Sequence, residues 1–283
     1  MINMIKMDLY RLRRTKSMYV IWAIMALVIL FTTAMSKMDG EQLAETATQM
    51  GAIVVEQEEE TETTNIGMAI ELPENTGNTI TVYDMVYANV QGKAVALFIV
   101  IFAVLFATGD LNSGYIKNIG GQVKSRGKLV VSKAFAIFVF TILTMLLFIL
   151  IQAVSNGIFL GYIEWGNIGD FLLYSVIEIL LHFAFAIICM SVAILLRNNV
   201  VSMILAVCMC MNVLMLLYNA IDKLIHKIGV EDFQLVNYTV TGKISMMSYE
   251  ITSKESVSAI CVAAVFIVGM LVLSGIVFEK KDI

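Results

Sequence analysis

Residues 134–154 read AFAIFVFTILTMLLFILIQAV, a run without a single charged residue. A helix needs about 20 apolar residues to cross the hydrocarbon region of a bilayer, and this run has that length. Similar runs recur along the chain, in which 59% of the residues are hydrophobic and 15% are charged, against about 25% charged in an ordinary soluble domain. A soluble fold has too little interior to bury that much apolar surface. The sequence therefore predicts an all-α, polytopic membrane protein.

Six membrane spans are predicted. Five runs have the required length, and they are Met18–Met35, Ala134–Val154, Phe171–Leu196, Val200–Ile221 and Val257–Phe278. The sixth, Ala94–Thr108, is short, so we expect its helix to begin earlier, near Met85. This start places Asn89, Gln91 and Lys93 at the outer interface, where Lys93 can extend its ammonium group into water.

The distribution of lysine and arginine predicts the orientation of this six-helix domain, residues 18–283. With the amino terminus inside, thirteen of the nineteen lysines and arginines lie in cytoplasmic segments and six lie outside. Such an excess is typical of the cytoplasmic side of a membrane protein. Both termini are thus predicted to be cytoplasmic. The lack of an organelle signal and of cysteines in the polar loops favours a bacterial plasma membrane.

Residues 1–17 precede the first span and show helical periodicity. The apolar stripe consists of Ile2, Ile5, Leu9 and Leu12, and the far side carries Arg11 and Arg14. This pattern predicts an amphipathic helix that lies on the inner leaflet. The simpler interpretation is a positive flank that only orients the first span.

Two outer segments differ in character. Residues 36–93 are predicted to form a long, acidic extracellular loop with a cluster of glutamates at 56–62, either as a solvated charge run or as a region that attracts cations. Residues 222–256 mix apolar and polar side chains without a full span. We expect this second segment to form re-entrant or interfacial helices.

The inner loop, residues 109–133, contains the sequence DLNSGYIKNIGGQVKSRGKLVVSK. Ser113 is placed to cap a short helix on which Tyr115, Ile116 and Ile119 share a face. Apolar residues on a cytoplasmic loop indicate docking on another protein. The alternative is a basic loop that rests on anionic lipid headgroups.

No enzyme site is predicted in this chain. It has no G-x-x-x-x-G-K-[ST] motif, no G-x-G-x-x-G motif and no G-x-S-x-G motif. With His182 and His226 as the only histidines, neither an H-E-x-x-H site nor a histidine-rich metal site is expected. We therefore expect no cofactor or metal in the chain itself.

Glu178 and His182 are the ionisable pair within a predicted span. They are four residues apart, so they share one face of the helix. An ionisable residue at membrane depth is by default a functional hypothesis. Two interpretations stay open: the pair lines a transport pathway, or it only fixes the packing of the helices.

The order of these features resembles that of a type-2 ABC transporter permease, the membrane subunit of exporters for drugs, bacteriocin-like peptides and polysaccharides. The local match consists of Ser113-Gly114-Tyr115-Ile116-Lys117-Asn118-Ile119, Gly121, Ser125-Arg126 and Ser132-Lys133. The layout covers nearly the whole chain, whereas the motif covers about 25 residues. The large acidic outer loop departs from the compact loops of that family.

The resemblance implies that residues 113–121, together with Arg126, form a coupling segment that docks on a separate ATP-binding subunit with a P-loop. That partner would bind ATP and Mg, and two permeases would pair with two ATPases. Residues 1–17 would be the family's elbow helix. The expected function is export of an amphipathic peptide or a lipophilic, drug-like molecule.

The partners expected are the ATPase, a second permease copy, membrane lipid and a hydrophobic or amphipathic peptide, and not nucleic acid. This hypothesis has three alternatives. They are a stand-alone secondary transporter or channel, a membrane sensor with an acidic extracellular loop, and a membrane-embedded hydrolase, whose necessary residues are missing.

Overall fold

The computed structural model describes residues 1–50, 70, 79–112, 127–228, 230 and 233–280. Within these ranges the regular structure is entirely helical. The elements are α1 (Ile2–Arg14), α2 (Lys16–Met50), α3 (Val82–Gln91), α4 (Ala94–Asn112), α6 (Gly127–Phe159), α7 (Ile168–Leu196), α8 (Asn199–Cys210), α9 (Leu214–His226), the 3-10 helix η1 (Leu235–Tyr238), α10 (Val240–Met246) and α11 (Ser253–Lys280). The prediction of an all-α, polytopic membrane protein is confirmed.

Four of the described helices are individually long and apolar enough to cross a membrane, namely α2, α6, α7 and α11. Two bent pairs pass the same test together: α3 with α4, bent by 53°, and α8 with α9, bent by 66°. The structure thus has four candidate spans, or up to six if each bent pair counts as one.

The predicted continuous helix over Val200–Ile221 is wrong. The chain leaves the helix at Met211, and Asn212 adopts a left-handed conformation with φ of 57° before α9 begins. Asparagine tolerates this conformation better than most residues because its short polar side chain can bond locally. The apolar character of the run continues across the break, so composition alone gives no sign of it.

The helix expected to begin near Met85 begins at Val82 and breaks after Gln91. Thr81 caps α3: its hydroxyl accepts from the backbone N–H of Asp84, whose carboxylate in turn accepts from the N–H of Thr81. Lys93, at the break, has φ of 59° and only 2% of its surface exposed. It therefore does not extend into water at the outer interface, as the sequence analysis expected.

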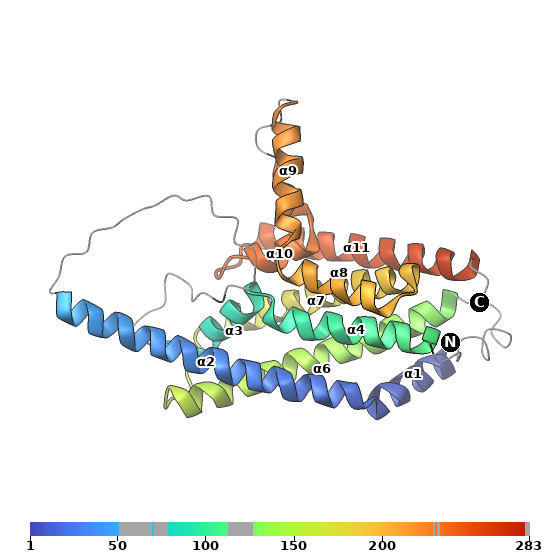
Figure 1. The fold of residues 1–283 in the computed structure, drawn as a ribbon. Coiled ribbons are helices and arrows are strands. Elements are labelled where there is room, and N and C mark those ends of the chain that lie inside the picture. Colours follow the sequence, from blue (N-terminus) through green and yellow to red (C-terminus); the bar gives the residue numbers. More distant parts are fainter. Residues whose placement is uncertain (51–69, 71–78, 113–126, 229, 231–232, 281–283) are drawn as a thin grey trace.

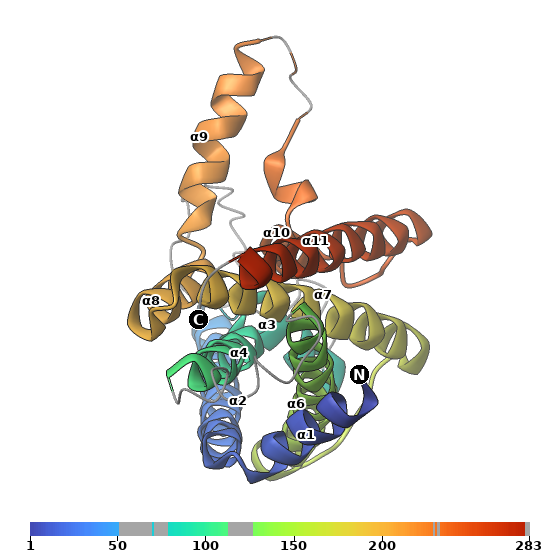
Figure 2. The ribbon, with the colours of Figure 1, turned by 90° about the vertical axis from the view of Figure 1, so that its right-hand side faces the viewer.

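α7 is the central element of the bundle. It packs against α4, α6, α8, α10 and α11, and Figure 2, which looks along the bundle from the end that carries α1, shows α11 on one side of it and α4 with α6 on the other. Its inner residues are fully buried, including Tyr174, Glu178, His182 and Phe185. α2 packs against α6 and α4 at the far side of the bundle.

The ends of the bundle are distinct. Figure 1 shows α1 and the last turn of α11 at the same end, whereas α3 and α10 lie toward the opposite end. α9 leaves the bundle sideways in the same view. The short helix α10 packs against α3, α7 and α11, so the segment predicted to be re-entrant is built into the bundle over part of its length.

Gly242 makes the close approach of α10 and η1 possible. A Cβ atom at this position would collide with the carbonyl oxygen of Val236, and would lie 2.6 Å from Val236 Cγ2 and 2.8 Å from Thr239 Oγ1. Two of these three atoms belong to Val236, and one of them is main chain, so the site has little freedom to adjust.

We therefore expect Gly242→Ala to destabilise the protein by about 1–3 kcal/mol, because it overpacks a tight contact. The measurement is the thermal unfolding midpoint in detergent. Gly275→Ala on α11 is the matched control, since a Cβ there meets nothing within 4 Å and alanine favours the helix. An equal response of both variants would contradict this interpretation.

Candidate functional site

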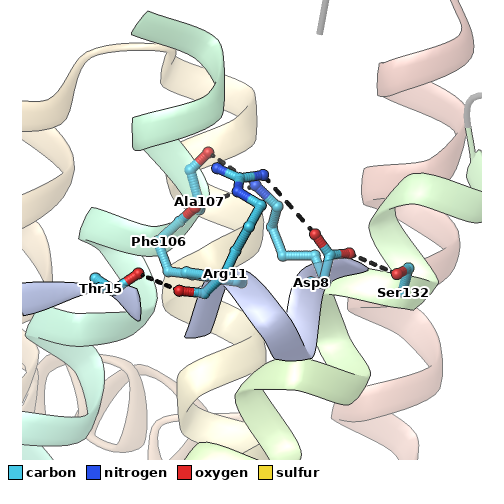
Figure 3. A network of polar contacts seen from close by, with 7 residues as sticks. Asp8, Arg11, Thr15, Phe106, Ala107 and Ser132 are labelled. Atoms are coloured by element: carbon cyan, nitrogen blue, oxygen red, sulfur yellow. Dashed lines mark hydrogen bonds and ion pairs between the residues drawn. The ribbon is translucent and has the colours of Figure 1, made fainter. Parts of the chain in front are cut away.

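A network of polar contacts joins α1 to α6, and α6 to α4, the two helices that flank the inner loop (Figure 3). We call it the α1 junction, and its members are Asp8, Arg11, Phe106, Ala107, Ser132 and Lys133. Ser132 Oγ donates to Asp8 Oδ2 at 2.5 Å, which joins α1 to the beginning of α6. Arg11 Nη1 lies 3.8 Å from the other carboxylate oxygen of Asp8.

Lys133 joins α6 to α4 within the same junction. Its ammonium group donates to the carbonyl oxygens of Phe106 at 3.1 Å and Ala107 at 3.4 Å, and lies 5.3 Å from the centre of the Phe106 ring. These carbonyls belong to the C-terminal part of α4, where a cation is favoured by the helix dipole. Lys133 itself is 7% exposed, so this contact is shielded from water.

The corner between α1 and α2 is also fixed. Thr15 Oγ1 donates to the carbonyl oxygen of Arg11 at 2.8 Å, and the hydroxyl of Tyr19 donates to that of Arg13 at 2.9 Å. α1, α4 and α6 are therefore held to one another near residues 112 and 127, between which the inner loop runs. A force applied to that loop would act on three helices at once.

The predicted stripe of α1 is only partly right in its placement. Leu12 is buried and Ile5 and Leu9 are half-buried, whereas Ile2 is 70% exposed. Arg11 is half-buried and paired with Asp8, so its assignment to the far side is wrong. The apolar pattern did not predict the burial of Asp8, because such a pattern is defined by apolar residues only. A carboxylate can nevertheless be buried when it has hydrogen-bond partners.

The residues assigned to ATPase coupling lie outside the described part of the chain. These residues are Ser113, Gly114, Tyr115, Ile116, Lys117, Asn118, Ile119, Gly121 and Arg126. The acidic cluster at 56–62 lies outside it as well. Both assignments stay predictions.

Glu178 and His182 are brought together on the inner face of α7, and Tyr174 extends the same stripe by one turn. All three side chains are fully buried. His182 Nδ1 hydrogen bonds with the main-chain carbonyl of Glu178 at 2.8 Å and lies 3.2 Å from its carboxylate Oε2. Among the described residues, Glu178 Oε1, the Tyr174 hydroxyl and His182 Nε2 have no hydrogen-bond partner, and His182 is the only neighbour paired with Glu178 Oε2.

Unpaired buried polar atoms of this kind are rare in folded proteins and call for an explanation. A carboxylate surrounded by protein in a membrane span is favoured only if it is neutral, hydrated or paired with a ligand at some stage. The α7 stripe, meaning Tyr174, Glu178 and His182, is therefore a second candidate site. Both interpretations offered by the sequence, pathway and packing, are consistent with its geometry.

A second polar layer ties α2, α3 and α6 together. Gln152 Nε2 donates to Thr33 Oγ1 at 3.0 Å, which joins α6 to α2, and Asn89 Nδ2 donates to Gln152 Oε1 at 3.4 Å, which joins α3 to α6. Within α6, Gln152 Nε2 also donates to Asn156 Oδ1 at 2.9 Å. Gln152, Thr33, Asn89 and Asn156 are all fully buried. The layer could not be predicted from the sequence, because a single amide in an apolar run gives no sign of which helix it will meet.

Aromatic rings close the bundle at the end that carries α3. Tyr83 stacks on Tyr249 with ring centres 4.2 Å apart, and its hydroxyl donates to the main-chain oxygen of Tyr249 at 2.6 Å. Burial raises the pKa of Tyr249, and a hydrogen bond with the carboxylate of Asp84 raises it further. The rings pack directly on one another, so we interpret this cluster as a packing contact that holds this end of the bundle together.

Residues 47–283 match the protein family described as "Protein of unknown function (DUF2705)". The chain belongs to this family. The DUF2705 match begins within the last turn of α2 and extends over the α7 stripe and over Ser132 and Lys133 of the α1 junction. Asp8 and Arg11 lie before it. The comparison with curated proteins found no match.

The α1 junction leads to a prediction about stability. Asp8→Ala and Ser132→Ala should each destabilise the protein by about 1–3 kcal/mol, because each leaves a buried polar partner without its hydrogen bond. The double variant should be less destabilised than the sum, with a coupling of about 0.5–3 kcal/mol. Thermal unfolding in detergent gives these values.

Lys6→Ala, an exposed change on the same helix, serves as the control and should have little effect. Strict additivity of Asp8→Ala and Ser132→Ala would show that the contact does not hold α1 to α6.

Proposed function

We propose that the chain is the membrane subunit of an ATP-driven exporter of the type-2 ABC class, energised by a separate ATP-binding subunit. The observation that carries the proposal is the α1 junction. Coupling by a docked ATPase requires that movement of a short loop be passed to the spanning helices. A loop whose two flanking helices are clamped to each other and to α1 meets that requirement.

The sequence of the inner loop supports the same assignment. Tyr115, Ile116 and Ile119 give it an apolar face in a region otherwise rich in lysine and arginine. Such a face gains free energy when it is buried against a partner. A P-loop protein is the partner proposed, since this chain has no nucleotide-binding motif of its own.

The complete transporter is proposed to contain two copies of this chain and two ATPases, with both termini of each permease in the cytoplasm of a bacterial cell. The substrate proposed is an amphipathic peptide or a lipophilic, drug-like molecule. Support for that class is the apolar character of the chain, in which 59% of the residues are hydrophobic.

The proposal predicts which loop residues hold the ATPase. Purified from native membranes in mild detergent, the wild-type chain should carry a P-loop subunit and ATPase activity, and Tyr115→Asp or Ile116→Asp should release both. A carboxylate at a buried apolar contact is desolvated without a partner, which accounts for the loss.

Ile163→Asp in the exposed segment between α6 and α7 is the matched control and should retain the subunit. A chain that purifies alone, without ATPase activity, would overturn the exporter assignment.

A stand-alone secondary transporter is the second candidate, and two observations favour it. Broken spans and buried ionisable residues near the middle of a bundle are typical of ion-coupled transporters. The bends at α3–α4 and α8–α9 and the α7 stripe provide both features.

Glu178→Gln tests the pathway role in either mechanism, because it removes the charge but keeps the size of the side chain. If the α7 stripe lines the pathway, this variant should be expressed normally but show altered transport or altered pH dependence of transport in membrane vesicles. Glu164→Gln, an exposed change in the outer segment, should behave as wild type. Unchanged transport by Glu178→Gln would assign the stripe to packing alone.

A further inference from the structure

The helix α9 presents three different faces. One is held by the returning chain: the Tyr218 hydroxyl hydrogen bonds with Thr241 Oγ1 at 2.8 Å, and Asp222 Oδ1 accepts from the backbone N–H of Leu235 at 2.8 Å. Figure 2 shows this return, through η1, beside the part of α9 nearest the bundle. The other two faces have no cover in the described structure.

The first open face is apolar. Val213, Leu217, Ala220 and Leu224 follow one another at helical spacing and are all exposed, with 54% exposure at Leu217 and 61% at Leu224. Leu217 and Leu224 are seven residues apart, and with Val213 and Ala220 they form a continuous stripe on the outside of the helix.

The second open face is polar and lies directly beside the first. It consists of Asn219, Lys223 and Lys227, all exposed. His226, at the edge of this face, hydrogen bonds through Nε2 with the main-chain oxygen of Phe233 in the returning chain at 2.9 Å. A helix with an apolar stripe flanked by a basic one is the pattern of a segment that lies in the boundary between acyl chains and headgroups.

The direction of α9 fits this location. α8 runs with the spanning helices and packs against α4 and α7, whereas α9 is bent away from α8 by 66°. If α8 follows the membrane normal, a bend of this size brings α9 closer to the membrane plane than to the normal. Figure 1 shows α9 projecting away from the bundle accordingly.

The bend is fastened to a second break in the chain. The ammonium group of Lys93, at the α3–α4 break, donates to Asn212 Oδ1 at the α8–α9 break. Both residues are left-handed, with φ of 59° and 57°. Non-glycine residues hold this conformation only when their surroundings enforce it. The side-chain hydrogen bond between the two breaks stabilises both left-handed residues, and it thereby fixes the direction in which α9 leaves the bundle.

We propose that α9 is an interfacial arm that binds the lipid bilayer, with Leu217 and Leu224 among the acyl chains and Lys223 and Lys227 at the phosphate groups. The Lys93–Asn212 hydrogen bond fixes its direction. The occupant of the open faces is lipid because the apolar and basic stripes adjoin. In water the apolar stripe would gain no free energy from burial, and against an apolar protein surface the basic stripe would have no anionic partner. A bilayer supplies acyl chains for the one and phosphate groups for the other. This inference is independent of the energy source of transport.

The test measures the depth of individual positions. Nitroxide labels are placed at Leu217→Cys, Lys223→Cys and Leu224→Cys, one at a time, in a Cys208→Ala/Cys261→Ala background; Cys189 and Cys210 are buried and stay. The full chain is reconstituted in vesicles of phosphatidylcholine and phosphatidylglycerol. Collision rates with oxygen, which partitions into acyl chains, and with a water-soluble nickel chelate are compared.

We expect labels at 217 and 224 to collide preferentially with oxygen and the label at 223 with the nickel chelate. Preference for nickel at all three positions would place the arm in water and overturn the proposal. Loss of access to both reagents at 217 and 224 would show that protein, such as a second copy of the chain, covers the apolar stripe, and would overturn it as well.

The role of the break is tested in the same labelled proteins. Asn212→Gly permits the left-handed conformation but removes the acceptor, and Lys93→Met removes the donor. Each should reduce the difference in oxygen access between 217 and 223, since the arm loses its fixed direction. Asn237→Ala, a change at an exposed asparagine of η1 outside the two open faces, should leave the difference unchanged. If Asn212→Gly and Lys93→Met also leave it unchanged in folded protein, the hydrogen bond does not set the direction of the arm.

Discussion

A buried polar group at a helix break finds no water to bond, so another part of the chain has to satisfy it. This constraint explains the hydrogen bond between Lys93 and Asn212. Two helices stop at these residues, and each provides the polar group that the other lacks. The breaks thereby support one another, and the paths of α4 and α9 away from them are set together.

The same constraint shapes the end of the bundle that carries α1. Asp8 and Lys133 bear charges that are almost completely buried, and both are engaged by groups on a neighbouring helix. Because removing one partner would leave the other unsatisfied in a poorly solvating environment, such contacts resist separation. Three helices, α1, α6 and α4, are in this way linked to one another next to the inner loop.

The α7 stripe places its polar groups differently. The contacts of the α1 junction and of the Gln152 layer join different helices, whereas Glu178 and His182 face each other within one helix, with His182 Nδ1 3.2 Å from Glu178 Oε2. Among the described residues, the Tyr174 hydroxyl, Glu178 Oε1 and His182 Nε2 have no hydrogen-bond partner, although all three side chains are fully buried. The stripe therefore keeps unused hydrogen-bonding capacity in the centre of the fold.

Apolar runs of about 20 residues determine by themselves that this chain is a helical membrane protein, because burial of that much apolar surface in lipid does not depend on which helices become neighbours. The spans at 18–35, 134–154, 171–196 and 257–278 could be placed on this ground, as could the pairing of Glu178 with His182 within one helix. The break at Asn212 could not, since it interrupts a run whose hydrophobicity is continuous, and neither could the hydrogen bond that joins it to Lys93. Nor could the α1 junction, in which Asp8 and Ser132 are 124 residues apart in the chain and meet only when α1 and α6 pack. Tertiary structure decided these features because a buried polar group is stabilised by its partner, and the partner is known only when the helices have come together.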